Sequence, residues 1–162
     1  MARRAPCYSG SMKIFENISE LTAFAGQSGV ASEWITITQE RVNQFADATG
    51  DHQWIHVDVE RAKAGPFGAP IAHGFLTLSL LPWFFQNAVE VRNIRMGVNY
   101  GLNKVRFVAP VPVGSRLRAH LKLLRAEPID GNGMQMTWEM SVEREGADKP
   151  VCVAESLSRL YG

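Results

Sequence analysis

The sequence predicts an α+β fold, in which an antiparallel β-sheet wraps around one buried helix. Segments 116–123 and 134–142 alternate between apolar and polar residues, which is typical of strands with one buried face. The run over 72–89 is apolar on nearly every side, which indicates a buried central helix. Asp-Gly-Asn-Gly at 130–133 separates the two alternating segments and favours a β-hairpin turn.

Local patterns predict these further elements, in chain order: a helix over 12–25, a strand over 34–37, helices over 39–48 and 59–64, and strands over 91–100, 104–108 and 150–161. Thr38 and Asp58 are suited to cap the second and third of the helices, because their side-chain oxygens can accept hydrogen bonds from free backbone N–H groups. Pro82 is expected to kink the central helix or to end its regular part.

The length of 162 residues is enough for one domain with its own hydrophobic core. We expect residues 12–162 to form that domain. Residues 1–11 carry two arginines but no apolar segment, so we expect a flexible N-terminal tail and not a secretory signal. The longest apolar run, over 75–85, is too short to span a bilayer, and no membrane association is expected.

Charge and cysteine content exclude several classes of function. A net charge of +1 does not suggest the concentrated basic surface that binds nucleic acid. Two cysteines, Cys7 and Cys152, are too few for a disulfide framework or a cysteine-based zinc site. A chain of this composition is expected in the reducing cytoplasm.

The candidate chemistry lies in segment 50–56, which reads Gly-Asp-His-Gln-Trp-Ile-His. Asp51 and His56 cannot share a helical face, because five residues advance a helix by about 140° beyond a full turn. We therefore expect an irregular loop that turns both side chains inward. Taken alone, Asp51 is more typical of a turn, and His56 fits a packed histidine as well as a catalytic one.

Segment 50–56, followed by Ala-His-Gly at 72–74, resembles the signature of the MaoC-like dehydratases, the R-specific enoyl-CoA hydratases with a hot-dog fold. The family pattern is Gly-Asp-x-Asn-Pro-aliphatic-His. Here Gln53 stands in place of the asparagine and Trp54 in place of the proline. The resemblance extends from about residue 34 to the C-terminus and implies the same sheet-around-helix architecture that the periodicity predicts.

The resemblance also implies an activity, the reversible syn addition of water to a trans-2-enoyl-CoA in fatty acid metabolism. Asp51 and His56 would hold and activate one water molecule together, and Gln53 would orient the water or the histidine. Acid–base help of this kind is worth about 10²–10⁴ in rate. Gly74, at the start of the central helix, would donate its backbone N–H to the thioester carbonyl.

Other residues are candidates for substrate binding. His73 adjoins Gly74, although capping or packing at the helix start is the simpler explanation of it. Trp54 could narrow the acyl pocket. Lys104 and Arg106 lie on one face of a predicted strand and could contact the phosphates of coenzyme A, although a solvated basic face explains each of them more simply.

The resemblance further implies a homodimer, paired edge to edge so that no strand edge is left exposed. The expected partner is an acyl-CoA substrate, with an acyl carrier protein ester as a second carrier. No metal and no cofactor beyond coenzyme A itself is expected. Two alternatives stay open: a hot-dog thioesterase, in which Asp51 directs water at the carbonyl carbon, and a non-catalytic acyl-CoA-binding module.

Overall fold

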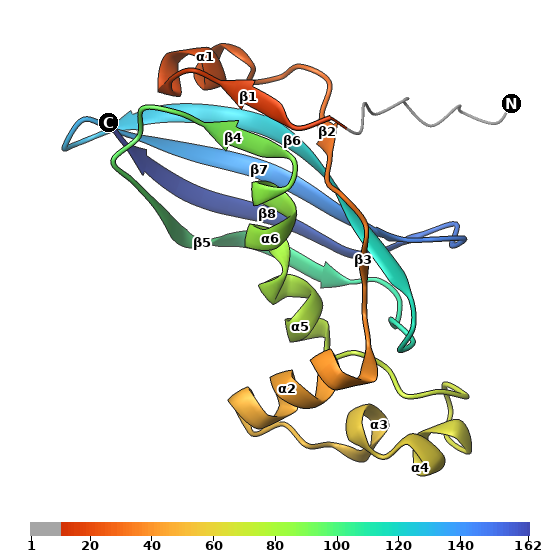
Figure 1. Cartoon of the computed structure of the whole chain (residues 1–162). Coiled ribbons are helices and arrows are strands. Elements are labelled where there is room, and N and C mark those ends of the chain that lie inside the picture. The colour runs from red at the N-terminus through yellow and green to blue at the C-terminus, as the bar shows by residue number, and fades with distance from the viewer. Residues whose placement is uncertain (1–10) are drawn as a thin grey trace, which may run out of the picture.

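A computed structural model of the chain describes residues 11–162, so the predicted tail over 1–11 lies almost wholly outside the described residues. The predicted α+β architecture is confirmed: a curved antiparallel sheet lies behind a broken central helix (Figure 1). The strand order in the sheet is β2-β6-β7-β8-β5, and β3 also pairs with β6.

The sheet is built from long strands that continue past the predicted alternating segments. Their bounds are β2 Val30–Ala31, β3 Ile35–Thr36, β5 Met96–Phe107, β6 Arg116–Ile129, β7 Gly133–Arg144 and β8 Pro150–Tyr161. Leu121 pairs with Met140, and Met140 pairs with Ala154, so apolar residues of three strands stand side by side on the face toward the helix. The predicted hairpin is confirmed, since Gly131 and Asn132 adopt φ of 77° and 57° between β6 and β7.

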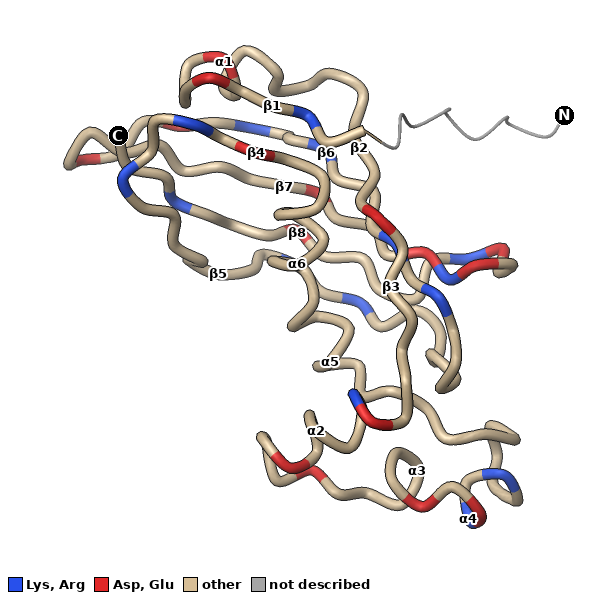
Figure 2. Tube along the Cα trace, viewed as in Figure 1, with Lys and Arg blue, Asp and Glu red and all other residues tan. Residues whose placement is uncertain are grey.

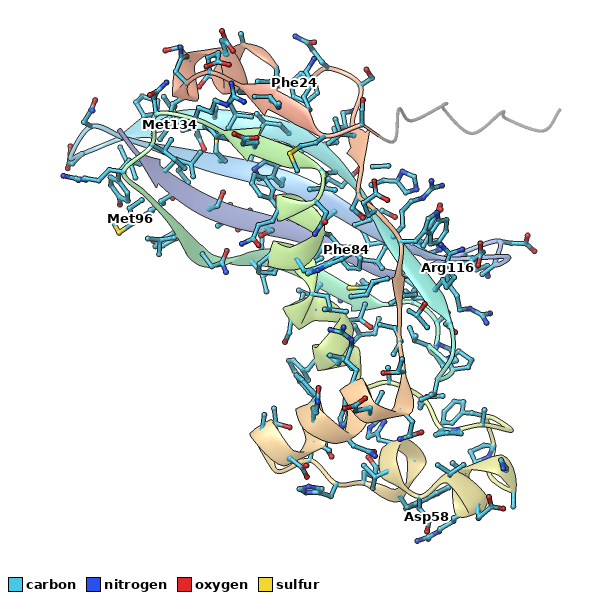
Figure 3. The ribbon with its side chains drawn as sticks, viewed as in Figure 1. Phe24, Asp58, Phe84, Met96, Arg116 and Met134 are labelled. Carbon is cyan, nitrogen blue, oxygen red and sulfur yellow. The ribbon has the colours of Figure 1, made fainter. Side chains whose placement is uncertain are left out.

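The central helix is divided in two, as Pro82 led us to expect. Helix α5 spans Gly74–Ser79 and α6 spans Leu81–Gln86, with Pro82 in the first turn of α6. Phe84 is fully buried against the sheet (Figure 3). The expectation that the helix is buried on every side is wrong for Phe75, which is 67% exposed, because the sheet covers only one side of α5.

Two predictions along the chain are wrong in detail. The predicted first helix is a strand followed by a shorter helix: β1 (Lys13–Phe15) pairs in parallel with β4 (Val89–Val91), and α1 (Ile18–Ala23) begins only where Asn17 caps it. The separate strands predicted over 91–100 and 104–108 are one strand, β5, interrupted by two register shifts.

Three helices form an arm that extends beyond the end of the sheet: α2 (Gln39–Thr49), α3 (Trp54–Val57) and α4 (Val59–Lys63) (Figure 1). The predicted caps are confirmed, since the side chain of Thr38 accepts a hydrogen bond from Arg41 N and that of Asp58 accepts one from Arg61 N. This arm carries the 50–56 segment and places it beside the start of α5.

Charged residues are absent from α5, from α6 and from the first eight residues of β5, 96–103 (Figure 2). Positions of Lys and Arg and of Asp and Glu are both found along the other long strands and along α2 and α4 (Figure 2). Within residues 11–162, every helix is too short or too polar to cross a membrane.

Candidate active site

Asp51 follows directly on the end of α2. Gly50 closes that helix with φ of 81°, a left-handed conformation that favours glycine, and its N–H bonds the carbonyl of Ala46 at 2.8 Å. Asp51 lies on the short loop that follows, and its side chain is 53% exposed. The predicted irregular loop is therefore correct for Asp51 but wrong for His56, which lies within helix α3.

His56 is held rigidly from two sides. Its residue is 6% exposed, and its Nδ1 lies 2.6 Å from the backbone oxygen of Ile71. Because a carbonyl can only accept, Nδ1 carries the proton and Nε2 of the neutral ring presents a lone pair. Gln39 Nε2 donates to the backbone oxygen of His56 at 2.8 Å. Neither Ile71 nor Gln39 was predicted, because each lies at least 15 residues away in sequence.

Asp51 and His56 converge. A carboxylate oxygen of Asp51 and a ring nitrogen of His56 lie within 4.8 Å of each other. One water molecule can span that gap, since two hydrogen bonds of about 2.8 Å join atoms up to about 5.6 Å apart. The pair thus offers one anionic and one neutral acceptor at a separation that one water molecule can bridge.

The surroundings of His56 keep it neutral. Burial, which disfavours the charged ring, is the main reason that the pKa of His56 lies below its ordinary value of 6.5, and the neighbouring His73 acts in the same direction. The hydrogen bond to Ile71 and the charge of Asp51 oppose this shift without cancelling it. His56 is therefore suited to accept a proton near neutral pH.

His73 is buried beside both groups. Its residue is 3% exposed, its ring stacks on His56 with centroids 3.8 Å apart, and its Nε2 lies 2.9 Å from the backbone oxygen of Asp51. Substrate binding is the role that its sequence position suggested. That role stays a prediction, and the contacts described here are those of a packed histidine, the simpler explanation.

One nitrogen each of His56 and His73 and an oxygen of Asp51 lie within 4.8 Å of one another. Three such atoms are the smallest set that could form a metal site. The donor set does not suit a metal ion, however. His73 Nε2, which faces Asp51, donates to the Asp51 carbonyl and so has no lone pair to offer. These three residues are better suited to proton transfer than to metal binding.

The two departures from the family pattern fall at the start of α3. Gln53 is the N-cap residue, and its side chain makes no capping hydrogen bond. Asparagine is among the best N-cap residues and proline is favoured at the next position, so the usual Asn-Pro is a strong helix start. Trp54 instead packs on Gly65 and stacks under the guanidinium of Arg61, 4.4 Å from the ring centroid.

Gly74 begins α5 against the side chain of Phe107. A Cβ added at Gly74 would lie 2.9 Å from the Phe107 ring, so a larger residue fits here only if that ring moves. As the first residue of a helix, Gly74 has a backbone N–H with no acceptor within that helix. This N–H follows directly on His73, next to the Asp51–His56 pair.

An apolar cavity of about 740 Å³ opens between α5, α6 and β5. Its walls include Leu78, Phe85, Ile94, Leu102 and Leu160. The first of these, Leu78, lies four residues beyond Gly74, or about 6 Å along the helix. Trp54 packs on α4 and does not line this cavity, and its contact with an acyl chain stays a prediction.

Three further polar side chains are exposed and are not part of the pair. His52 is exposed and bonds Asp47 at 2.8 Å, and that hydrogen bond raises the pKa of His52. Lys104 and Arg106 are exposed on the face of β5 opposite to Phe107, because successive side chains of a strand alternate. Their contact with coenzyme A stays a prediction.

Residues 21–145 match the MaoC like domain family. The chain is 57% identical over 148 residues to the 3-hydroxyacyl-thioester dehydratase Z of Mycobacterium tuberculosis, covering 91% of this chain and 98% of that protein. The family resemblance read from segments 50–56 and 72–74 is thereby confirmed.

Solved structures agree on the fold. The R-hydratase PhaJ1 of Pseudomonas aeruginosa superposes with a TM-score of 0.64 at 25% identity, covering 82% of this chain and 80% of that one. A monoamine oxidase regulatory protein from Archaeoglobus superposes with a TM-score of 0.72 at 24% identity, covering 93% of this chain and 97% of that one. The predicted hot-dog fold is confirmed.

Proposed function

The chain belongs to the MaoC-like domain family, and we propose that it is a hydro-lyase that interconverts trans-2-enoyl thioesters and (R)-3-hydroxyacyl thioesters. The single observation that carries this proposal is the convergence of Asp51 and His56 within 4.8 Å of each other. Support comes also from the name of the 57% identical dehydratase and from the likeness to an R-hydratase.

The geometry suits a reaction with one water. The Asp51 carboxylate and His56 Nε2 each accept a hydrogen bond from it and increase the nucleophilicity of its oxygen. The oxygen adds to the β-carbon of the enoyl thioester, and the proton that the water gives up reaches the α-carbon on the same face. In the reverse direction the same two groups remove the elements of water from the hydroxyacyl thioester.

Addition at the β-carbon places negative charge on the thioester oxygen. The N–H of Gly74 is the donor we assign to that oxygen, since it is unused within α5 and lies next to the pair. From there the acyl chain would run along α5 into the apolar cavity that begins at Leu78. No cofactor is needed, because the carrier's pantetheine arm delivers the thioester.

The test supplies crotonyl-CoA and follows two signals at once, the enoyl absorbance and the release of free thiol. With crotonyl-CoA we expect the enoyl absorbance to fall to an equilibrium value. With (R)-3-hydroxybutyryl-CoA as the starting material we expect that absorbance to rise to the same equilibrium. Neither reaction should release thiol. Thiol release without reversible hydration would instead identify a thioesterase. Binding of acyl-CoA with neither signal would identify a non-catalytic binding module.

The protonation state of His56 predicts the pH dependence. The neutral ring is the active form, so kcat/KM should fall as pH drops through the pKa of His56. Because burial and His73 hold that pKa below 6.5, we expect the midpoint of the acidic limb of kcat/KM to lie below pH 6.5. Initial rates from pH 5 to 9 test this, and an acidic limb centred above pH 6.5 would contradict the assignment.

We also propose a homodimer that forms through β5. Within residues 11–162, β5 pairs only with β8, so the other edge of this 12-residue strand is open. Its first half is uncharged and exposes Met96, Val98, Tyr100 and Leu102 by 41–54% (Figure 3 shows Met96 pointing away from the sheet). A long apolar edge of this kind is normally paired or covered.

The dimer is tested by sedimentation equilibrium. The expected mass is about 36 kDa, twice the 18.0 kDa of one chain. Val98→Lys places like charges at the paired edge and should shift the protein toward monomer. Ile14→Lys, at a comparably exposed apolar residue of β1, is the matched control and should stay dimeric. A wild-type protein that sediments as a monomer would rule the dimer out.

The expected cytoplasmic location is likewise a proposal. Cys152 is a free thiol buried in the core, and burial raises its pKa to about 11, so it is suited to packing and not to redox chemistry.

A further inference from the structure

His73 contacts three separate segments of the arm while its own backbone begins α5. Its ring stacks on His56 of α3 at 3.8 Å and 25°, and it packs at 4.9 Å against Phe45 of α2. Its Nε2 donates to the backbone oxygen of Asp51. A single buried side chain thus touches both members of the proposed catalytic pair.

The hydrogen bond from His73 is the shortest that Asp51 makes. The Asp51 N–H lies 3.4 Å from Thr49 Oγ1, and its carboxylate lies 3.4 Å from the N–H of Gln53, both at the limit of hydrogen bonding. The bond from His73 measures 2.9 Å. On a loop that begins with a glycine, this contact is what holds the Asp51 backbone in one orientation.

The hydrogen bond also decides where the proton of His73 resides. The Asp51 carbonyl accepts, so Nε2 carries hydrogen and Nδ1 of the neutral ring does not. Nδ1 is buried, with no hydrogen-bond partner among residues 11–162.

We infer that His73 is a positioning residue, which aims the Asp51 carboxylate through its N–H and sets the plane of His56 through its ring face. The inference rests on the proposed function, because it assigns His73 to the same reaction. The titratable groups that face His73 are Asp51 from the loop and His56 from α3, while α2 contributes only Phe45. In this assignment His73 acts through these two groups and is not itself the acid or base of the reaction.

Two variants separate the two contacts. His73→Phe keeps a ring against His56 but has no donor for Asp51, whereas His73→Gln keeps an N–H at a similar reach but has no ring. We expect His73→Phe to lower kcat/KM by about 10²-fold, the scale of a 1 Å displacement of a catalytic group, and His73→Gln to restore much of that loss. Both should move the acidic limb of the pH profile to higher pH, because His56 loses its imidazole neighbour.

Histidine ¹⁵N chemical shifts test the inference without turnover. We expect His73 to be protonated at Nε2 and His56 at Nδ1, and the titration of His56 to move to higher pH in both variants. His73 protonated at Nδ1, or a His56 titration that is unmoved in both variants, would overturn the inference even if hydration is observed. Conversely, the wild-type protein could show the expected protonation of His73 and His56 but no hydratase activity. That result would reject the proposed function and still support the positioning geometry.

The kinetic comparison decides between positioning and packing. Equal losses in His73→Phe and His73→Gln with an unchanged pH profile would show that His73 only fills space, and would overturn the inference. A wild-type rate in His73→Phe would overturn it as well. Thermal unfolding of each variant confirms that the losses compared are those of folded protein.

Discussion

Asp51→Asn is expected to lower kcat/KM for crotonyl-CoA hydration by about 10²–10⁴-fold with little change in melting temperature. The substitution keeps the shape of the side chain but removes its charge and one of its two acceptor oxygens. The fold should tolerate it, because the side chain is 53% exposed and its only hydrogen bond within residues 11–162 is 3.4 Å long. Steady-state rates and thermal unfolding measure the two effects separately.

The matched control is Asp47→Asn. Asp47 is also a carboxylate beside a histidine, with its Oδ1 2.8 Å from His52 Nε2, but it lies on the exposed surface of α2. It should retain the wild-type rate. If Asp51→Asn also kept that rate, or if both variants lost activity equally, the carboxylate of Asp51 could not be the group that activates the water.

His56→Asn should lower kcat/KM by a similar factor, about 10²–10⁴. Asparagine can place its side-chain N–H near the position of the histidine Nδ1, so it can still donate to Ile71 at the site of the 2.6 Å bond. It has no group in the place of Nε2. The loss in rate should therefore appear with only a small loss in stability, measured by the same pair of experiments. A rate within a few-fold of wild type would remove His56 from the mechanism.

His56→Ala is the less informative variant. His56 is buried on a helix and not exposed on a loop. Alanine would leave the Ile71 carbonyl without its donor, which costs about 1–3 kcal/mol, and would vacate the space of the ring. A loss of activity in this variant would mix catalysis with folding.

The secondary structure was predictable in segments where one local sequence pattern dominates. The alternation in β6 and β7 reports a sheet with one buried face, and Asp130 to Gly133 could form little other than a tight turn. Thr38 and Asp58 cap helices because short polar side chains reach free N–H groups. Each of these signals is complete within a few residues.

The errors arose where distant contacts decide the structure. Residues 12–15 have a helical apolar pattern, yet Lys13–Phe15 pairs with Val89–Val91, about 76 residues away, and that pairing overrides the local preference. Phe75 is exposed although it belongs to an apolar helix, because the sheet reaches only one side of α5.

In the candidate site too, some residues were predictable from the sequence and others were not. Asp51 and His56 were identified from their spacing and from the family resemblance. The groups that hold His56, namely Gln39 and Ile71, carry no signal of their own, since a glutamine side chain and a backbone carbonyl acquire their roles only in the folded chain. The stacking of His73 on His56 is of this kind too.

The central claim is that Asp51 and His56 act as a unit on one water molecule. It is tested most directly by kcat/KM of the double variant Asp51→Asn/His56→Asn beside the two single variants. When two groups act as a unit, the effects of replacing them are strongly non-additive. We therefore expect kcat/KM of the double variant to fall by no more than about the larger of the two single losses. A double loss equal to the product of the single losses would mean that the two side chains act independently, and would contradict the shared-water mechanism.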